Sequence, residues 1–392
     1  MRAAATSARS TSLPVWAEVL GDLETPVAAY LKLVGDGDGF LLESVEHAER
    51  WARYSFVGHD PVATLELRDG LIEIKGQHLS ADIPLDQGML AALDAIIAAY
   101  RAPIIPDLPP LQGGVMGYLG YDTIREVEHL PHVPHDDRGF PDAVMSIIGS
   151  LAAFDHWRQR VYLIESVPVL DMNTEAIDRE YDEACVRVQR AVDKLSQPLS
   201  SPAAEPPQLG EAAPEVRSSM ADGVYQQAVE VAKEHILAGD IFQVVLAQRY
   251  DIDLQADPFD FYRVLRQVNP SPYMYFLRHP DITIAGSSPE PMVKVLGRTV
   301  VSRPIAGTRR RGRTDDDDRR MAGELKENPK EVAEHIMLVD LARNDVGRVA
   351  EFGTCLLYTS DAADDLLCVD LGGRRTIKKK TNNTHHAPST TA

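Results

Sequence analysis

The stretch KENPKEVAEHIMLVDLARND, residues 326–345, predicts one helix that begins after Pro329 and is apolar over most of its circumference. On this helix Glu331, Glu334 and His335 lie on a single face, because residues three and four positions apart share a face. A helix that is apolar nearly all round is usually buried. The sequence therefore predicts a buried helix that carries two carboxylates one turn apart.

This carboxylate pair has two interpretations. Like charges at positions i and i+3 repel each other by about 0.2–0.5 kcal/mol even in water, and burial without a partner costs on the order of several kcal/mol for each charge. A divalent cation removes the conflict, and carboxylate oxygens together with a carboxylate-bearing substrate suit Mg²⁺. Alternatively, Glu331 and Glu334 form ion pairs with arginines such as Arg343 or Arg348, which is the more ordinary arrangement for a lone helix.

Two polar turns precede the helix. In GSSPE, residues 286–290, small residues permit a tight turn that can hold Glu290 rigidly at a cleft as a general acid. In RPIAGTRRRGR, residues 303–313, the backbone NH groups around Gly307 and Thr308 can bind a carboxylate. Taken alone, the first turn is an ordinary polar loop, and most arginines of the second have a solvated surface role.

Composition narrows the class of protein. The 392 residues leave room for two domains, and a net charge of −19 disfavours nucleic acid and anionic membranes as partners. The three cysteines form no CxxC motif, which predicts a reducing compartment and no zinc site. No run of 18 apolar residues is present, so the sequence predicts a cytoplasmic protein without a membrane span. The basic N-terminal stretch has no apolar core and is expected to be a frayed end.

The chain divides into four segments. Residues 14–195 form a predicted α/β lobe, and residues 196–217 contain five prolines among Ala, Ser and Glu, which predicts a linker. Organised sequence resumes over residues 218–354. Residues 355–392 show no sustained period and contain LLYTSDAADDLLCVDLGGRR, which resembles a translated sequencing adapter. We therefore expect residues 355–392 to be non-native or disordered.

Periodicity and turn signals predict the main elements. They are a hairpin over 63–76 turning at Asp69–Gly70, a helix over 89–102, two strands within 144–167, a helix over 173–196, a helix over 224–238 closed by Gly239, a strand over 241–254, a helix begun by Asp257–Pro258, and short strands near 283–286, 292–297 and 299–307. The glycines of QGGVMGYLGYD, residues 112–122, match no dinucleotide or phosphate-loop spacing and are expected to let strands pack closely.

Seven motifs occur in an order that resembles one family. They are LLESVEHAERWARYSFVG (41–58), GGVMGYLGYD (113–122), AGDIFQVVLAQR (238–249), NPSPYMYFL (269–277), GSSPE, RPIAGTRRRG and NPKEVAEHIMLVDLARNDVGRV (328–349). Together they resemble the large subunit, component I, of anthranilate synthase in the chorismate-utilising enzyme family. The resemblance covers roughly residues 14–354. It implies an α+β fold with a large two-sheet β-sandwich core and helices outside, here incomplete at the C-terminus.

The resemblance implies an activity and roles for site residues. Enzymes of this kind convert chorismate and ammonia to anthranilate and pyruvate, the first step of tryptophan biosynthesis. By analogy, Mg²⁺ holds the ring carboxylate, with Glu334 as a metal ligand and Glu331 in or beside the same shell. Glu290 resembles the acid near the C4 hydroxyl, and Gly307 with Thr308 resembles the cradle of a substrate carboxylate.

Two positions separate the relatives within the family. Aminodeoxychorismate synthases carry a lysine where this chain has Ala306, and isochorismate and salicylate synthases carry a lysine base where it has Gln243. Neither alanine nor an amide can supply that nitrogen as a nucleophile or base. Both positions favour ammonia as the nucleophile, with aminodeoxychorismate synthase component I kept as the alternative.

The resemblance also implies regulation and a partner. Tryptophan inhibits the family, and two elements of this chain match its pocket: Glu43 and Ser44 of LLES, and Pro272, Tyr273 and Met274 of NPSPYM. A carboxylate suits the ligand's ammonium group, and Tyr and Met suit its indole. A glutamine amidotransferase subunit is the usual partner and supplies the ammonia.

The family's sequence pattern continues beyond LARNDVGRV, whereas the expected GTLSGAPK-like segment and the further substrate and metal ligands are absent after Val349. We therefore expect a truncated chain that lacks synthase activity. A third hypothesis, of a different class, is a non-catalytic tryptophan-binding or subunit-docking fragment.

Overall fold

The structure is a computed structural model that describes residues 11–44, 53–76, 79, 82–169, 173–199, 201, 214–310, 312–359 and 369–372. The N-terminal stretch, most of the predicted linker 196–217 and most of the predicted tail 355–392 lie outside the described residues. Two compact units are present, unit 1 (Met1–Ser287) and unit 2 (Ser288–Ala392).

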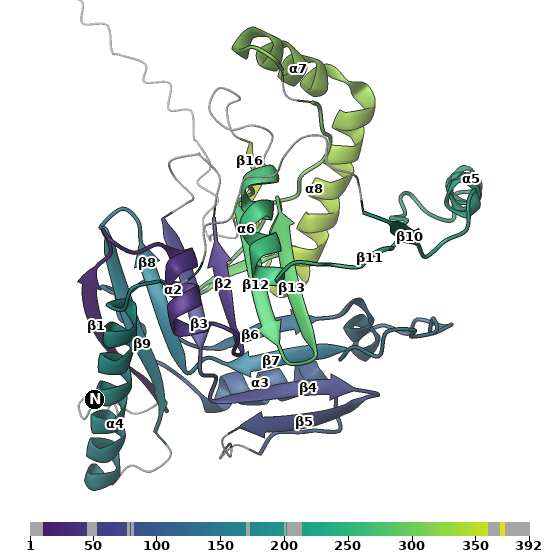
Figure 1. Cartoon of the computed structure of the whole chain (residues 1–392). Helices are drawn as coiled ribbons and strands as arrows, with labels where there is room; N and C mark the ends of the chain where they lie inside the picture. The colour runs from purple at the N-terminus through teal and green to yellow at the C-terminus, as the bar shows by residue number, and fades with distance from the viewer. Residues whose placement is uncertain are drawn as a thin grey trace, which may run out of the picture. The chain divides into compact units, whose positions relative to one another are not determined.

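A seven-stranded antiparallel sheet forms the centre of unit 1 (Figure 1). In spatial order its strands are β1 (Ser12–Leu20), β9 (Arg160–Pro168), β8 (Ser150–Asp155), β3 (Tyr54–His59), β2 (Gly39–Glu43), β12 (Tyr273–His279) and β13 (Ile282–Ser288). Strands from both sides of the predicted linker therefore share one sheet. The expected α+β fold class is confirmed.

A second, four-stranded sheet in unit 1 has the order β5-β4-β7-β6. Its strands are β4 (Ala63–Arg68), β5 (Leu71–Gly76), β6 (Val115–Leu119) and β7 (Ala143–Ile147). The predicted hairpin is confirmed: β4 pairs with β5, and Asp69 and Gly70 take positive φ angles of 50° and 76° at the turn. Asp and Gly tolerate that backbone region better than other residues, which is why this dipeptide reverses the chain.

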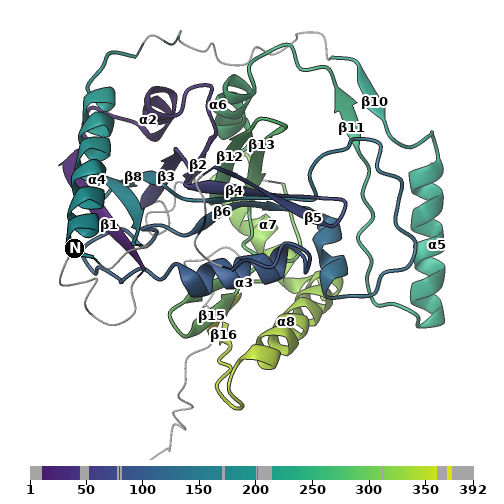
Figure 2. The same cartoon turned by 90° about the horizontal axis from the view of Figure 1, so that it is seen from below.

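Apolar side chains arrange unit 1 in four layers. One cluster packs α2 (Pro26–Leu33), α4 (Thr174–Leu195) and α6 (Pro258–Val268) on the outer face of the seven-stranded sheet (Figure 1). A second cluster fills the space between the two sheets with residues such as Phe40, Leu151, Ile164 and Leu277. A third places α3 (Met89–Ala99) on the far face of the four-stranded sheet (Figure 2). The resulting order is helix, sheet, sheet, helix.

Gly117 in β6 shows why the glycine-rich motif is needed for packing. A Cβ atom at this position would lie 1.9 Å from the carbonyl oxygen of Val144 and 2.8 Å from Cα of Met145. Both atoms belong to the backbone of β7, so no side-chain rotation could relieve the clash. The expectation that these glycines permit close strand packing is confirmed at this position.

Unit 1 also contains an arm that consists of β10 (Val216–Ser218), α5 (Val224–Ala238) and β11 (Tyr250–Ile252), together with the segments between them. β10 and β11 pair antiparallel. Gly239 follows α5 with φ of 83°, in the left-handed conformation that commonly ends a helix, as the sequence predicts. A short 3-10 helix, Tyr121–Glu126, follows β6 elsewhere in the unit.

Two strand predictions need correction. Residues 144–167 were expected to hold two strands, but three strands come from this region and its flanks. The chain leaves β7 of the four-stranded sheet at Ile148–Gly149 to enter β8 of the seven-stranded sheet, and His156–Gln159 turns it again between β8 and β9. A strand was expected over 241–254, but only Tyr250–Ile252 pairs as a strand. The apolar alternation of 241–249 is strand-like, but within the described residues this segment contains no strand.

Unit 2 consists of strands β14 (Lys294–Leu296), β15 (Thr299–Ser302), β16 (Tyr358–Thr359) and β17 (Val369–Gly372), and helices α7 (Asp315–Glu327) and α8 (Pro329–Val349). The described strands form a sheet in the order β14-β15-β17-β16. The aperiodic sequence after residue 355 did not predict β16 and β17. Among the helices of the described chain, none combines the length and apolar character that crossing a membrane requires.

Asp155, at the end of β8, gives a pH-dependent contribution to stability. Its side chain is 2% exposed and accepts hydrogen bonds from Arg53 Nη2 at 2.7 Å and from the backbone NH groups of Trp157 and Arg158 at 3.2 Å. Burial alone would raise the pKa of Asp155, but these hydrogen bonds outweigh burial and lower the pKa below the ordinary value of 3.8. The carboxylate therefore stabilises the fold above the unfolded-state pKa, and this stabilisation is lost as the pH falls through the lower folded-state pKa.

We expect Asp155→Asn to lower the free energy of unfolding at pH 7 by about 1.5–3 kcal/mol, the usual range for hydrogen bonds to a charged group. Urea unfolding of the wild type and the variant at pH 7, 4 and 3 should show the difference shrinking between pH 4 and pH 3. Asp94→Asn, at an exposed position of α3, is the matched control and should change stability little. A difference that stays constant with pH would contradict the assignment.

Candidate functional site

Unit 2 brings together several of the predicted site residues. Glu290 follows β13, and its Oε1 atom accepts a hydrogen bond of 2.9 Å from the backbone NH of Ile305. Ile305 lies two residues before Gly307 in the predicted carboxylate cradle. The hydrogen bond therefore joins the predicted acid to the predicted cradle.

Gly307 joins this same segment to the start of α8. Its φ angle is +77°, in the left-handed region that favours glycine. A Cβ atom here would lie 2.8 Å from Oε2 of Glu331 and 3.0 Å from Cδ1 of Leu325. The turn at Gly307 and the Glu331 carboxylate are therefore neighbours, and a larger residue would separate them.

Glu331 is fixed from two directions. Asn328 caps α8, and its side-chain oxygen accepts hydrogen bonds from the backbone NH groups of Lys330 at 3.0 Å and Glu331 at 3.3 Å. Arg309 Nη1 lies 3.1 Å from Oε1 of Glu331 and donates to the backbone oxygen of Thr308 at 2.8 Å. The acid also benefits from its place in the first turn of the helix, where the helix dipole favours negative charge.

The arginine that pairs with Glu331 differs from the arginines that the ion-pair interpretation named. Arg309, from the basic run after Thr308, pairs with Glu331. Arg343 instead pairs with Asp340 at 3.1 Å. Arg309 is 22 residues away from Glu331 in sequence, and the turn at Gly307 brings it back to the helix.

The expectation that α8 is buried is wrong for the described structure. Its buried residues are Val339, Ala342 and Val346, which form a single stripe three and four residues apart. Ile336 and Leu341 are more than half exposed. The described chain covers only some of the apolar residues of α8 and leaves the others exposed to solvent. A nearly continuous apolar circumference therefore did not lead to burial.

Glu334 lies one turn beyond Glu331 on α8 and is half-buried, as Glu331 is. The side chain of Glu331 is 18% exposed, which leaves it accessible to a small ligand. Glu334 takes part in an interaction of its own. The two carboxylates therefore share a partly solvated helix face, where the repulsion between them is weaker than in a protein interior.

A separate acidic cluster lies in unit 1. Among the described residues, Glu66, His279 and Asp281 place potential metal-ligand atoms within 4.8 Å of one another. Glu66 is 2% exposed, pairs with Arg68 and accepts a hydrogen bond of 2.6 Å from Lys75 Nζ. Burial alone would raise the pKa of Glu66, but hydrogen bonds from Lys75 and Arg68 outweigh burial and lower it. Two cations already balance this cluster, and it contains none of the predicted metal ligands.

The two elements predicted to bind tryptophan are adjacent strands of the seven-stranded sheet. β2 and β12 are neighbouring antiparallel strands (Figure 1). Met274 lies directly opposite Glu43 in their register. Pro272 and Tyr273 lead into β12 and are half-buried, and Met274 is 1% exposed. Residues that are remote in sequence therefore meet at one place in unit 1.

Glu43 is buried and already engaged by α6. Its Oε2 atom accepts a hydrogen bond of 2.9 Å from Tyr262, and its Oε1 atom accepts one of 2.8 Å from Arg266. Burial raises the pKa of Glu43, and Arg266 and the Tyr262 hydroxyl oppose that rise. Burial likewise raises the pKa of Tyr262. Ser44, next in the chain, has a buried hydroxyl without a hydrogen-bond partner among the described residues.

Gln243 belongs to unit 1, in the exposed segment 241–249, whereas Glu290, Thr308 and Glu331 belong to unit 2. Sequence reasoning missed Arg309 as the partner of Glu331 and Asn328 as its cap. An Asn before Pro at a helix start is a capping signal that could have identified Asn328. It also missed Tyr262 and Arg266, which are four residues apart on the amphipathic α6.

A family model described as chorismate binding enzyme matches residues 42–358 of this chain. Anthranilate synthase component 1 of Mycobacterium tuberculosis (strain ATCC 25618 / H37Rv) is 40% identical over 352 residues, covering 87% of this chain and 67% of that protein. The corresponding protein of Thermus thermophilus is 42% identical over 338 residues, covering 86% of this chain and 68% of its own length.

Solved structures agree with this match. The crystal structure of anthranilate synthase component I from Streptococcus pneumoniae aligns with a TM-score of 0.66 at 28% identity and covers 92% of this chain and 76% of its own. The menaquinone-specific isochorismate synthase from Escherichia coli aligns with a TM-score of 0.57 at 12% identity, covering 93% and 70% of the two chains, and shows a shared fold.

Proposed function

Because this chain belongs to the family of chorismate binding enzymes, we propose that it is the large subunit of an anthranilate synthase. The reaction is the conversion of chorismate and ammonia to anthranilate and pyruvate. The observation that carries the proposal is the identity of 40% and 42% to proteins named anthranilate synthase component 1, over 352 and 338 residues.

Two residues support ammonia as the nucleophile. The resemblance leads us to compare Ala306 and Gln243 with the lysines that other chorismate enzymes use. An alanine methyl group has no lone pair, and an amide nitrogen is not basic, so neither residue can attack chorismate or activate water. An external amine is then needed, and this distinguishes the proposal from aminodeoxychorismate and isochorismate synthases.

The site residues of unit 2 can be given roles in that reaction. The hydrogen bond from the Ile305 backbone NH orients Glu290, which we assign as the acid that protonates the departing C4 hydroxyl. The turn at Gly307 and Thr308 presents backbone NH groups of the kind that bind a substrate carboxylate. Arg309, bonded to Glu331 and to the Thr308 carbonyl, fixes the distance between this turn and α8.

Magnesium suits the carboxylates of α8. Glu334 and Glu331 offer oxygen ligands of the kind that Mg²⁺ prefers, on a face that is partly solvated. Mg²⁺, when bound, would supply positive charge for the ring carboxylate of chorismate. Arg309 already neutralises Glu331, so we assign Glu334 as the principal ligand and Glu331 as the neighbour that holds Arg309 beside the site.

The partner and the inhibitor follow from the same proposal. A component 1 protein implies a second component, which we propose is a glutamine amidotransferase subunit that supplies ammonia. The adjacent LLES and NPSPYM strands support an L-tryptophan pocket beside Ser44 and Met274. Since Tyr262 and Arg266 already engage Glu43, we propose that the ligand's ammonium group competes with Arg266 for this carboxylate.

A chimera tests the proposed reaction. The chimera consists of residues 1–349 of this chain followed by a C-terminal part of the Thermus thermophilus relative. That part begins directly after the segment of the relative that corresponds to residues 340–349. The chimera is assayed with chorismate, Mg²⁺ and ammonium. We expect equimolar anthranilate and pyruvate. Formation of aminodeoxychorismate or isochorismate would overturn the proposal. The 392-residue chain is assayed in parallel under the same conditions.

Tryptophan binding gives a second test, independent of turnover. We expect L-tryptophan to bind the 392-residue chain, and Ser44→Ala to weaken binding by about 5- to 10-fold, because the buried hydroxyl gains its missing hydrogen bond from the ligand. Isothermal titration calorimetry measures both proteins. Ser219→Ala, at an exposed position of the arm, is the control. Equal affinities of the wild type and Ser44→Ala would remove Ser44 from the pocket.

A further inference from the structure

The arm of unit 1 carries Gln243 on a segment that has no regular structure of its own. Within the described chain, residues 241–249 contain neither a helix nor a strand. At the N-terminal end of the segment, Asp240 Oδ2 lies 2.9 Å from Nδ1 of His235 in α5, and the Asp240 backbone NH donates to the His235 carbonyl oxygen at 3.0 Å. A segment without a ladder of backbone hydrogen bonds takes its position from the contacts at its two ends.

The C-terminal end of the segment is held at Arg249, the residue before β11. Its carbonyl oxygen accepts a hydrogen bond of 2.9 Å from the backbone NH of Ser219, and its own NH donates to Ser219 Oγ at 3.2 Å. Gln248 Nε2 donates to Ser218 Oγ at 2.6 Å. These contacts fix the end of the segment to the end of β10, so they hold it within the arm but not relative to the rest of unit 1.

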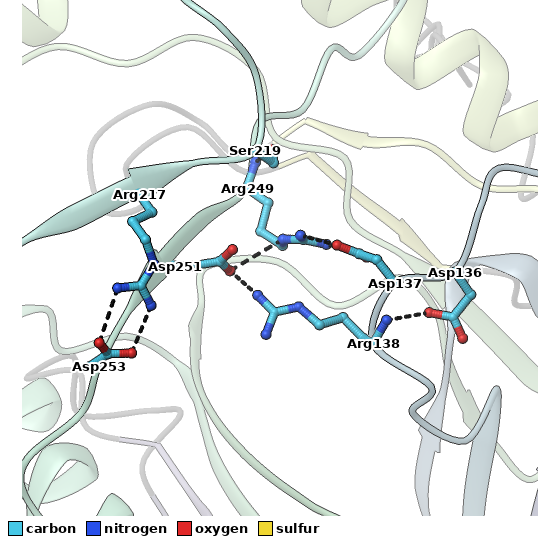
Figure 3. Close-up of polar contacts among 8 residues, drawn as sticks. All are labelled: Asp136, Asp137, Arg138, Arg217, Ser219, Arg249, Asp251 and Asp253. Atoms are coloured by element: carbon cyan, nitrogen blue, oxygen red, sulfur yellow. Dashed lines mark hydrogen bonds and ion pairs between the residues drawn. The ribbon is translucent and has the colours of Figure 1, made fainter.

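The Arg249 side chain connects the arm to the rest of unit 1 (Figure 3). Its two terminal nitrogens bind the Asp137 carboxylate with hydrogen bonds of 3.0 and 2.6 Å, and its Nε lies 3.3 Å from Oδ1 of Asp251. Arg138 pairs with the same oxygen of Asp251. Two arginines and two carboxylates therefore alternate across this contact. The hydrogen bonds from Arg249 lower the pKa of Asp137 to about 2, so its charge persists at all physiological pH values.

The turn at residues 136–139 is a fixed support for this contact. Asp136 Oδ1 accepts hydrogen bonds of 2.8 and 3.1 Å from two backbone NH groups within the turn (Figure 3). Arg68 of β4 donates to the carbonyl oxygen of Gly139 at 2.8 Å and to Asp281 at 2.7 Å. Asp281 lies between β12 and β13, so the turn is bound to both sheets of unit 1.

We propose that Arg249, together with Arg138, is a positioning residue. It holds the segment that carries Gln243 against the turn at residues 136–139. Single exposed ion pairs contribute little to stability, but pairs that share partners restrict the positions available to a segment. The inference rests on the proposed function for the role of Gln243, whose amide oxygen can accept a hydrogen bond from ammonia. A fixed amide holds ammonia in one place, and a loosened one binds it less well.

A distance measurement tests the positioning without any reaction. Spin labels are attached at Val245→Cys in the segment, an 86% exposed position, and at Glu73→Cys, an exposed position of β5. The 392-residue chain is used, with its three native cysteines replaced by serine. Pulsed electron paramagnetic resonance gives the distribution of distances between the labels. We expect Arg249→Gln to broaden this distribution, because the segment then samples more positions relative to the sheets.

Arg217→Gln is the matched control. Arg217 of β10 binds the Asp253 carboxylate with hydrogen bonds of 3.0 and 2.7 Å, through two nitrogens as Arg249 does with Asp137 (Figure 3). Asp253 directly follows β11, so this ion pair joins the two strands of the arm and its loss should leave the distance distribution unchanged. Arg249→Lys keeps the charge but not the paired hydrogen bonds, and should give an intermediate width.

The chimera described above tests the effect on the reaction. We expect Arg249→Gln to raise KM for ammonium about 10-fold, the effect of losing one hydrogen bond to ammonia, and to leave KM for chorismate unchanged. Arg249→Lys should restore part of this loss, and Arg217→Gln should react as the unsubstituted chimera does. A purely structural defect would lower kcat through the fraction of folded protein and would leave both KM values unchanged.

Two outcomes would overturn the inference. The first is a distance distribution that responds in the same way to Arg249→Gln and Arg217→Gln, because the network would then not fix the segment. The second is a broader distribution in Arg249→Gln with an unchanged KM for ammonium, because the segment would then not be held for the reaction. If the chimera forms another product, the proposed reaction fails, and the distance measurement still decides whether Arg249 positions the segment.

Discussion

Glu334→Gln in the chimera is expected to lower kcat/KM for chorismate by about 100- to 1,000-fold, the usual effect of removing one preorganised electrostatic contact. Glutamine keeps the shape of the side chain and one oxygen but removes the negative charge that would hold Mg²⁺. Glu331→Gln should have a smaller effect, of about 10-fold, because Arg309 already neutralises Glu331 in the structure. The order of the two effects follows from that ion pair.

The Mg²⁺ dependence of the rate separates loss of a ligand from loss of structure. We expect Glu334→Gln to need a higher Mg²⁺ concentration for half-maximal activity, while thermal unfolding without the ion is unchanged. Glu324→Gln on α7 is the control, since Glu324 is 55% exposed and pairs with Arg320 on the helix surface. Full turnover of Glu334→Gln, or a wild-type rate independent of divalent ions, would show that this helix face is not the metal site.

Gly117→Ala is expected to destabilise unit 1 by about 3 kcal/mol, the upper part of the range for overpacked sites. The added methyl carbon would lie 1.9 Å from the Val144 carbonyl oxygen. Gly117 pairs with Met145 across β6 and β7, so relief of the clash requires the two strands to move apart and weakens their hydrogen bonds. Urea unfolding of the 392-residue chain, followed by circular dichroism, measures the change.

Gly323→Ala provides the comparison, because Gly323 lies within α7 and a Cβ there meets no atom within 4 Å. Alanine is favoured over glycine in a helix by about 1 kcal/mol, so this variant should be as stable as the wild type or more stable. If Gly117→Ala were equally well tolerated, β6 and β7 would have to be further apart in solution than in the structure.

Local signals in the sequence predicted much of the fold. The Asp69–Gly70 turn, the cap at Asp257 and the end of α5 at Gly239 depend on backbone preferences of one or two residues, and the structure confirms all three. The amphipathic period of α4 likewise identified a helix from its own sequence. Such features need no knowledge of distant partners.

The features that sequence reasoning missed depend on which segments meet. Residues 241–249 have a strand-like pattern, but a strand also needs a neighbour, and the described chain provides none for them. Residues 144–167 and their flanks form three strands because the chain crosses from one sheet to the other at Ile148–Gly149, a break of only two residues within an apolar run. The burial of α8 was overestimated for a similar reason, since burial depends on what covers a helix and not on its own composition.

The candidate site shows the same division. The family resemblance assigned Glu290, Gly307 and Glu331 to one site, and the contacts of Ile305 and Gly307 bring these positions together. The arginine that pairs with Glu331 could not be predicted from the spacing of residues along the helix. Arg309 reaches it only because the left-handed turn at Gly307 folds the chain back, and such a long-range contact leaves no periodic signal.

The pairing of β2 with β12 has a consequence for synthesis of the protein on the ribosome. β2 emerges early, yet its neighbour on one side is made only after the whole of the first lobe, the linker and α6. Until then the nascent chain displays an open strand edge beside a partly formed apolar core, which is a template for aggregation. The high contact order of this pairing also predicts slow folding. A chaperone that shields β2 during translation would therefore raise the yield of folded chain more than one that acts after release.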